Sequence, residues 1–444
     1  MRSFHSRVAV ALTAVALAEP AAAIALQDAV EKTIINSPEV RLRLHQYHQA
    51  QSEQDLGRAS FLPTADASYG HGRETRETER GDTRGSGVWG WSLNLSQNLF
   101  NGYQSLYGDK RLGHAQRAGY LRFLDASEQQ ALEAARSYLD VLRYRRLVER
   151  AEANFTSHQA LHRQIERKTV AGVGRRVDLE QASGRLALAE ANLLTEKTNL
   201  HDVVARYTRV VGEAPPPQMA PVPAFADALP SDVAGLLPLL AASPAPRAAG
   251  EMVHAARFGV DARRGAFMPT LDLRARQEWG GGQDRPGGRD KRSLVELVTS
   301  FNLSRGGADR ARLKMARQEL DMALDEQEKA CRDTRQTLHI AYNDARRQQE
   351  NIAYLRQHAL STEKVRDAYR QQFDIGQRSL LDLLDSENEL FDSQRALVNG
   401  ESELLMARLR VAAAGGTLLS QLKLKPAELA DSGDDRPVCG GTVG

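Results

Sequence analysis

Apolar and polar residues alternate in two pairs of short segments, one pair in each half of the chain. The alternating segments are residues 63–69, 89–96, 271–276 and 295–303. A period of two places successive side chains on opposite faces of a β-strand. We therefore predict four strands in two hairpins, joined by a charged loop at 74–87 and a glycine-rich loop at 280–292. Each strand should lie between two different environments.

A seven-residue apolar repeat follows the second hairpin. Its main row consists of Leu383, Leu390, Leu397, Leu404 and Val411. A row of small residues runs three positions later, from Ser386 to Ala407, and a matching apolar row runs from Leu179 to Tyr207. A seven-residue period indicates helices in a left-handed supercoil, and small side chains let neighbouring helices approach closely. An ordinary antiparallel coiled coil and a closed ring of helices both fit this pattern.

The distribution of proline predicts very long helices. Nine of the sixteen prolines fall in residues 215–246, whereas 64–214 and 287–425 contain none. Residues 104–169 could form one helix of roughly 100 Å at the standard rise. A compact globular domain has little use for such a rod, whereas an elongated structure can use it.

The chain contains an internal duplication with an offset of about 205 residues. The matched anchors are Ser37-Pro38 with Ser243-Pro244, residues 61–64 with 267–270, Tyr138 with Tyr342, and Gly172 with Gly376. We expect repeat 1 at 24–214 and repeat 2 at 247–424, with the proline-rich linker 215–246 between them. Each repeat reads as a short helix (26–58 in repeat 1), a β-hairpin and long helices. Residues 425–444 form a polar tail that we expect to be disordered.

The first residues indicate export. Residues 1–23 have the basic start, apolar centre and Ala-rich end of a signal peptide, and no later apolar run is long enough for a spanning helix. The 59 basic and 57 acidic residues nearly balance, so the chain has no broad positive electrostatic field of the kind that attracts nucleic acid. The two cysteines make no disulfide framework, and we expect Cys331 to be a small residue of a helix.

The predicted strands leave two environments possible. A soluble four-stranded sheet fits the alternation, whereas the signal peptide and the aromatic residues Tyr69, Trp89, Trp91 and Trp279 favour a membrane. Four strands are too few to close a transmembrane barrel, which needs at least about eight. A water-filled duct would require at least three chains and twelve strands.

Several motifs resemble those of the TolC family of outer-membrane channel-tunnel proteins. Residues 171–179 and 376–385 look like the family's two periplasmic tips, and 95–102 and 301–307 look like its strand-to-helix transitions. The resemblance covers about residues 26–424. It implies a mostly α fold with a small β part, in which a homotrimer forms a twelve-stranded barrel in outer-membrane lipid, continued by an α-barrel. It also implies a periplasmic adaptor (membrane fusion protein) and an inner-membrane ABC transporter as partners, and no cofactor.

The resemblance assigns roles to residues of both tips. Asp382 and Asp385 share a helix face; alone they read as surface acids, but the family likeness implies an acidic ring of six carboxylates at the tunnel entrance of a trimer. Arg378 and Asp178 match the family's polar gate network between the two tips, and Arg175 and Arg176 could supply substitute contacts for two side chains that this chain lacks. Phe373 stands where the family often has tyrosine, and Val177 where it can have threonine. Gly172, Gly174 and Gly376 suit the tip turns and adaptor docking, with positive φ expected.

The sequence gives less support to other functions, such as metal binding, phosphate binding or catalysis. His158, His162 and Glu166 share a helix face and could bind a metal, but we interpret them as a solvated face. Residues 280–288 lack the Lys-Ser/Thr of a phosphate loop, and no catalytic constellation occurs, so we predict no enzyme. The main alternative to an outer-membrane channel is a protein of a different class, a soluble periplasmic coiled-coil adaptor. Within the channel class, type I secretion of a haemolysin-like toxin is favoured over small-molecule efflux, because no cysteine for a lipid anchor follows the signal peptide.

Overall fold

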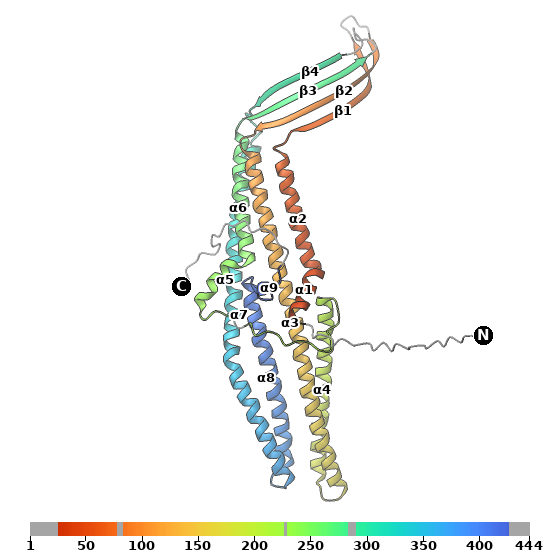
Figure 1. Ribbon diagram of the computed structural model, residues 1–444, viewed down its shortest axis with the longest axis vertical. Coiled ribbons are helices and arrows are strands. Elements are labelled where there is room, and N and C mark those ends of the chain that lie inside the picture. Colours follow the sequence, from red (N-terminus) through yellow and green to blue (C-terminus); the bar gives the residue numbers. More distant parts are fainter. Residues whose placement is uncertain (1–24, 78–82, 226–228, 283–289, 426–444) are drawn as a thin grey trace, which may run out of the picture. The chain divides into compact units, whose positions relative to one another are not determined.

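The computed structural model describes residues 25–77, 83–225, 229–282 and 290–425 and confirms a duplicated plan of helices, hairpin and long helices (Figure 1). The first repeat contains α1 (Leu26–Asn36), α2 (Pro38–Ala59), β1 (Thr64–Glu77), β2 (Thr83–Phe100), α3 (Gln104–Val170) and α4 (Arg176–Val211). The second contains α5 (Leu236–Ala242), α6 (Pro244–Arg264), β3 (Thr270–Gly282), β4 (Asp290–Ser300), α7 (Ala308–Asp374), α8 (Leu380–Ala414) and α9 (Leu418–Gln421). The expected signal peptide and nearly all of the expected tail lie outside the described residues.

The predicted single helix over 26–58 is wrong, because the structure has two helices there. Ser37 separates α1 from α2, and its hydroxyl accepts the backbone N–H of Val40 at 3.4 Å. Pro38 occupies the first helical position of α2, where its missing N–H is not needed. The equivalent pair, Ser243 and Pro244, also begins a helix, α6, with proline in the first turn, but the Ser243 side chain makes no cap hydrogen bond. The duplicated Ser-Pro therefore marks a helix start in both repeats.

The four strands form one antiparallel sheet in the order β1-β2-β3-β4. The strands are longer than predicted: pairing of β1 with β2 continues to Glu77 and Thr83, inside the predicted charged loop. The reason is that the backbone makes the ladder, so a change of side-chain polarity reports a change of environment and does not end a strand. By contrast, β4 ends at Ser300, so Phe301 and Leu303 lie outside the strand.

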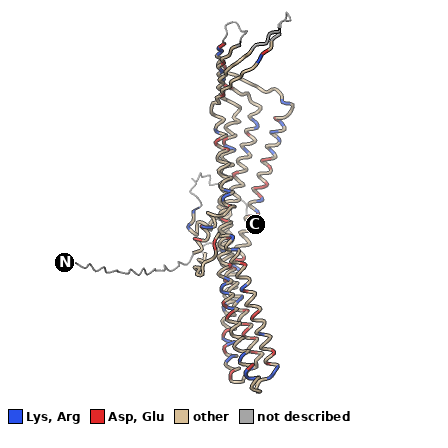
Figure 2. Tube along the Cα trace, turned by 90° about the vertical axis from the view of Figure 1, so that its right-hand side faces the viewer, with Lys and Arg blue, Asp and Glu red and all other residues tan. Residues whose placement is uncertain are grey.

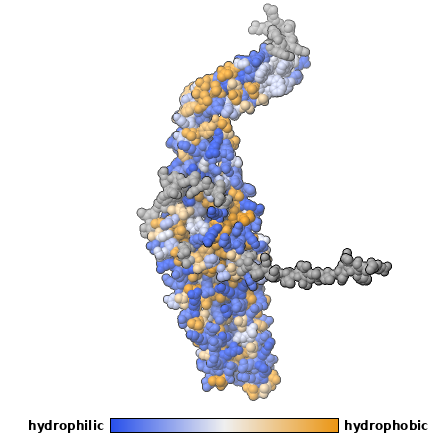
Figure 3. All heavy atoms as spheres, viewed as in Figure 1, coloured by the Kyte–Doolittle hydropathy of each residue, from blue (hydrophilic) through white to orange (hydrophobic). Residues whose placement is uncertain are grey.

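The register of the sheet confirms two different faces. Tyr69, Trp91 and Trp279 are direct cross-strand neighbours on one face. The same face carries alanine, leucine and valine in the adjoining rows: Ala65, Ala67, Leu93, Leu95, Ala275 and Val295. The opposite face carries mainly polar and charged side chains, among them Asp66, Ser68, Ser92, Asn94, Arg276 and Glu278. Hydrophobic residues gather over the sheet in Figure 3.

Within the described residues, each outer strand is paired on one side only. β1 pairs with β2, and β4 pairs with β3. The free edge of β1 is 14 residues long and that of β4 is 11. Long unpaired edges are templates for another strand.

The chain divides into two compact units. The sheet unit includes Ile34–Glu133, Phe225–Asn351 and the C-terminal part from Glu403; the hairpin unit includes Ala134–Ala224 and Ile352–Ser402. In the hairpin unit, α3 turns into α4 and α7 turns into α8 (Figure 1). No described helix combines the length and apolarity needed to cross a lipid bilayer.

The seven-residue repeat of α8 is confirmed as a packing seam. Leu383 and Leu390 are buried, and so are the small residues Ser386 and Ser393. A Cβ placed on Gly400 would lie 2.6 Å from Leu355 Cδ1 of α7. The small row therefore sets how closely α8 approaches its neighbour.

Cys331 lies on α7, as expected for a small helix residue.

Candidate functional site

The two tip turns that join the long helices have the same backbone geometry. Gly172 and Gly376 have φ of 78° and 77°. In each turn the residue after this glycine donates its N–H to a carbonyl five positions earlier: Val173 to Lys168 at 3.0 Å, and Gln377 to Gln372 at 2.8 Å. This is the Schellman motif, which favours glycine at the left-handed position. Positive φ is therefore confirmed at both residues.

Gly174 is needed for a different reason from the predicted one. It is not among the glycines with positive φ. A Cβ at Gly174 would lie 2.8 Å from both the backbone nitrogen and the Oγ1 of Thr169. The turn folds back onto the end of α3, and only a residue without a side chain fits there.

An apolar cluster joins the two hairpins next to the tips. Its buried members come from the first hairpin (Leu161, Ile165, Ala182) and from the start of α8 (Leu380, Leu383, Leu384). Tyr369 and Phe373 of α7 pack against this cluster. The Lys168 ammonium of α3 lies 5.2 Å from the centroid of the Phe373 ring. Phe373 thus contacts the other hairpin through its ring face, a contact that needs no hydroxyl group.

Arg378 is held by its own hairpin. Its guanidinium carbon lies 4.0 Å from the centroid of the Tyr369 ring, its Nε donates to Gln372 Oε1 at 3.1 Å, and its Nη1 lies 3.7 Å from Asp382 Oδ2. In the described chain, Arg378 does not pair with Asp178, the other residue of the expected gate network. Asp178 instead faces Arg175 at 3.2 Å.

The reason for this difference is local. Arg378 and Asp382 are one helical turn apart, as are Arg175 and Asp178, so these contacts require little ordering of the chain. Arg176 and Val177 are exposed on α4. Within the described chain, Arg378 and Asp178 therefore each pair inside their own hairpin, whereas Phe373 contacts Lys168 of the other hairpin.

The ion pair that does connect the hairpins at this level was not predicted. Arg185 Nη2 of α4 lies 2.5 Å from Asp385 Oδ1 of α8, although the residues are 200 positions apart. Arg185 carries no local sequence signal that would single it out from the other arginines of α4. Its role depends on how the two hairpins pack.

A buried polar layer follows further along α8. Glu387 is 5% exposed and faces Arg366 and Arg370 of α7, at 3.4 and 3.7 Å. Asn154 of α3 donates to the Glu387 carbonyl at 3.5 Å. The layer provides a second polar contact between the hairpins.

His158 lies beside this layer and is 1% exposed, so the interpretation of a solvated histidine face is wrong for this residue. Burial lowers the pKa of His158; Glu387 and Asn388 oppose the lowering, and Arg185 adds to it. His162 contacts Ser183 at 3.1 Å, and Glu166 is exposed. Among the residues described here, no group of three His, Cys, Asp or Glu side chains has a metal-binding arrangement.

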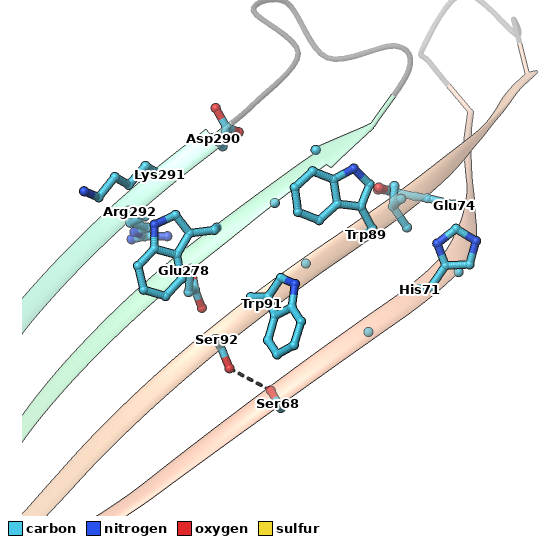
Figure 4. Close-up of a pocket in the computed structure, with 17 residues that line it drawn as sticks. Ser68, His71, Glu74, Trp89, Trp91, Ser92, Glu278, Asp290, Lys291 and Arg292 are labelled. Atoms are coloured by element: carbon cyan, nitrogen blue, oxygen red, sulfur yellow. Dashed lines mark hydrogen bonds between the residues drawn. The ribbon is translucent and has the colours of Figure 1, made fainter.

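The sheet carries the second candidate surface, a concavity of about 880 Å³ lined by residues of all four strands (Figure 4). The Tyr69 and Trp91 rings lie 4.8 Å apart on the apolar face. The hydroxyls of Ser68 and Ser92 lie 2.7 Å apart on the polar face. Trp91 is 52% exposed, so the residues that the structure describes leave this part of the apolar face uncovered. Such a face suits lipid, with aromatic rings at the interface.

Solved structures of bacterial outer-membrane channels share this fold. The chain is 18% identical to VceC from Vibrio cholerae, covering 88% of this chain and 96% of that one with a TM-score of 0.78. It is 17% identical to MtrE from Neisseria gonorrhoeae in the open state, with 89% of each chain covered and a TM-score of 0.77. The fold is thus that of an outer-membrane channel protein.

The sequence model of the outer membrane efflux protein family matches residues 29–213 and 238–417, one segment in each repeat. The chain belongs to this family. It is 25% identical to the efflux protein BepC from Brucella suis, over 84% of this chain and 81% of that protein. It is also 25% identical to the alkaline protease secretion protein AprF from Pseudomonas aeruginosa, over 90% and 86%.

Family membership confirms several expectations. The protein is a TolC-family transport protein of the outer membrane with a large periplasmic part. The family consists of channel proteins, so the protein is not an enzyme. Membership also selects the channel over the soluble coiled-coil adaptor.

Proposed function

We propose that the protein is the outer-membrane duct of a tripartite export system and that it works as a homotrimer. The observation that carries this proposal is the two-faced sheet with a free edge on each side. If β1 of one copy pairs with β4 of the next, three copies supply twelve strands, enough for a barrel with a water-filled interior. The apolar face would contact lipid and the polar face would line the pore.

The partners follow from this role. A duct in the outer membrane contains no energy source, so it needs a periplasmic adaptor and an inner-membrane transporter. We propose that these are a membrane fusion protein and an ABC transporter. The tip turns at Gly172, Gly174 and Gly376 supply the adaptor docking surface in this proposal. The exposed apolar side chains beside them, Val173 at 79% and Ile375 at 69%, support it, since such residues favour a protein contact.

For the cargo we propose a protein of the type I secretion class, such as a haemolysin-like toxin. Two relatives are named for protease secretion: AprF, and PrtF from Dickeya chrysanthemi, which is 25% identical over 90% of each chain. Small-molecule efflux is the second candidate. It is favoured by OpmQ from Pseudomonas aeruginosa, named for pyoverdine export and 24% identical over 87% of this chain.

The tips form the gate in this proposal. Asp382 and Asp385 contribute the acidic ring, and Arg378, Asp178, Arg175, Arg176 and Phe373 contribute the contacts that hold the entrance closed. The apolar cluster at the start of α8 supports this role, because it packs both hairpins together where the pore would narrow. Opening would separate the hairpins at this cluster.

Two measurements test the proposal. The mature protein, purified in detergent, should have the mass of three chains and should conduct ions in a planar bilayer. A non-conducting monomer would overturn the channel proposal. Deleting the gene should then remove a large protein from the culture medium without changing drug susceptibility. The reverse result would replace secretion by small-molecule efflux.

A further inference from the structure

The two ends of the sheet face different sides of the membrane when the sheet spans it as proposed above. At one end the strands meet helices, since β1 follows α2 and β2 leads into α3. The protein has a large periplasmic part, to which the long helices belong. The opposite strand ends, at Glu77, Thr83, Gly282 and Asp290, therefore face the cell exterior.

The two faces of the sheet differ in the sign of their charges. Residues of both signs occur along the helices (Figure 2), and the polar face is mixed as well, with Arg276 lying 3.5 Å from Glu278. On the apolar face, over Thr64–Thr75 and the positions paired with this segment, the formal charges are Arg73 and Lys291. Both side chains are exposed, and among the residues described neither makes an ion pair. This face thus carries unpaired positive charge.

Both basic residues lie at the outer margin of the apolar face. Lys291 is the direct cross-strand neighbour of Trp279, in the row that also contains Tyr69 and Trp91. Arg73 lies four positions beyond Tyr69, about 14 Å further along the strand. Aromatic rings mark the level at which the hydrocarbon of a membrane meets the headgroups. Long basic side chains at this level reach the headgroups, where their charge is tolerated.

Small residues separate the two basic side chains. Arg73 lies on β1 and Lys291 on β4 (Figure 4), three strand spacings or about 14 Å apart across the sheet. On this face Gly87 is the partner of Arg73, and Gly281 is the partner of Trp89. A Cβ added to Gly87 would meet no atom within 4 Å. The surface between the two charges therefore leaves room for a bulky headgroup.

We propose that Arg73 and Lys291 bind a phosphorylated glycolipid of the outer leaflet, of the class to which lipid A belongs; this site rests on the proposed membrane-spanning role of the sheet. Each basic side chain holds one phosphate of a headgroup that is phosphorylated at both ends. Arginine can do so with two hydrogen bonds, and lysine acts as a point charge. Trp91 and Trp279 contact the sugar and the upper acyl chains. A phospholipid with one phosphate would reach only one of the two charges.

The chain offers a matched control on the same strand. Arg292 follows Lys291, and its partner in the ladder is Glu278, so it lies on the polar face. It is also exposed. Arg292→Gln removes one positive charge at the same level of the sheet without changing the apolar face. Lys291→Arg keeps the charge and serves as the conservative variant.

The test uses the full-length mature protein in detergent, titrated with lipid A that carries two phosphates, with lipid A that carries one, and with phosphatidylglycerol. Native mass spectrometry counts the bound lipid. The wild type should bind the doubly phosphorylated lipid A most tightly. Lys291→Gln and Arg73→Gln should each weaken this binding about fivefold, the effect of one basic side chain near an anionic surface. Inorganic phosphate at the same concentration should not displace the lipid, since it lacks the acyl chains.

Arg292→Gln and Lys291→Arg should bind lipid A as the wild type does. If Lys291→Gln and Arg73→Gln also bind like Arg292→Gln, or if phosphatidylglycerol binds the wild type as tightly as lipid A, the inference is overturned. Displacement by inorganic phosphate would overturn it too, because the site would then be one for free anions. The mass and the conductance of the same preparation separate the two proposals: a conducting trimer without selective lipid binding leaves the channel standing. A non-conducting monomer overturns both.

Discussion

Glu128 binds the start of the C-terminal helix α9: its carboxylate accepts the backbone N–H of Leu418 at 3.1 Å. The other carboxylate oxygen accepts the N–H of Leu419 at 3.3 Å. Glu128 is 5% exposed, and burial raises the pKa of its carboxyl group to about 7. The two backbone hydrogen bonds act to lower this pKa, and the nearby Asp125 acts to raise it. A single side chain of α3 therefore fixes the C-terminal segment and titrates near neutral pH.

The raised pKa of Glu128 predicts that its contribution to stability falls as pH rises. Between pH 4.5 and about 7 the folded protein binds this proton more tightly than the unfolded chain does. Raising the pH through this window therefore favours unfolding. Glu128→Gln should be more stable than the wild type at pH 8, by roughly 1–3 kcal/mol, and similar to it at pH 5. Urea unfolding at the two pH values measures the difference; an equal loss at both would show that hydrogen bonding outweighs charge.

His158 predicts the opposite pH dependence for the hairpin unit. Burial lowers the pKa of His158 below its ordinary 6.5, so the folded state keeps the ring neutral while the unfolded chain takes up a proton in acid. Stability should therefore fall below pH 6.5, by at most about 1.4 kcal/mol per pH unit. His158→Gln should lose less stability than the wild type between pH 7 and 5. His162→Gln, one turn further along α3, is the control and should keep the wild-type pH dependence.

The tip turns predict a contrast between the glycines of the turns and a glycine inside a helix. Gly172→Ala and Gly376→Ala place a Cβ at positive φ, which costs about 1–2 kcal/mol each. Gly184, inside α4, has no neighbouring atom within 4 Å of an added Cβ. Gly184→Ala should stabilise the helix by about 0.5–1 kcal/mol. Thermal unfolding of the three variants should show opposite signs; a stabilised Gly172→Ala would mean that the turn adopts another geometry.

The elements of this fold could be predicted where the sequence pattern is repetitive. The seven-residue rows and the proline-free stretches predicted the long helices, and the alternation predicted the two faces of the sheet. Element ends were harder to predict. The break at Ser37 depends on one side-chain cap, and the strands continue into charged residues because the backbone alone makes the ladder.

The contacts of the site were less predictable than its location. Both tips and the glycines of their turns could be found from motifs. The ion-pair partners of Asp382 and Asp385 could not be predicted from the sequence. Arg185 and Asp385 meet only after the two hairpins pack, and Arg378 pairs with the nearby Asp382 and not with the distant Asp178. Pairing across 200 residues depends on tertiary structure.

The duplication supplies the last prediction, because Tyr138 and Tyr342 are equivalent residues of the two repeats. Both are buried, and both hydroxyls donate to carbonyls of the segment between the repeats: Tyr138 to Ala220 at 2.7 Å, and Tyr342 to Ser231 at 3.4 Å. Each tyrosine thus ties its own unit to this segment. Removing a buried hydroxyl leaves a carbonyl without this donor, which costs about 1 kcal/mol or more when the hydrogen bond is short.

Tyr138→Phe should therefore destabilise the protein more than Tyr342→Phe, although the two changes are chemically identical. Because the phenyl ring keeps the packing of each site, the difference between the variants reports the hydrogen bonds and not a cavity. Urea unfolding of both variants measures it, and each serves as the control for the other. Equal losses would mean that the 2.7 and 3.4 Å contacts contribute alike, and that the connecting segment is held by its other contacts.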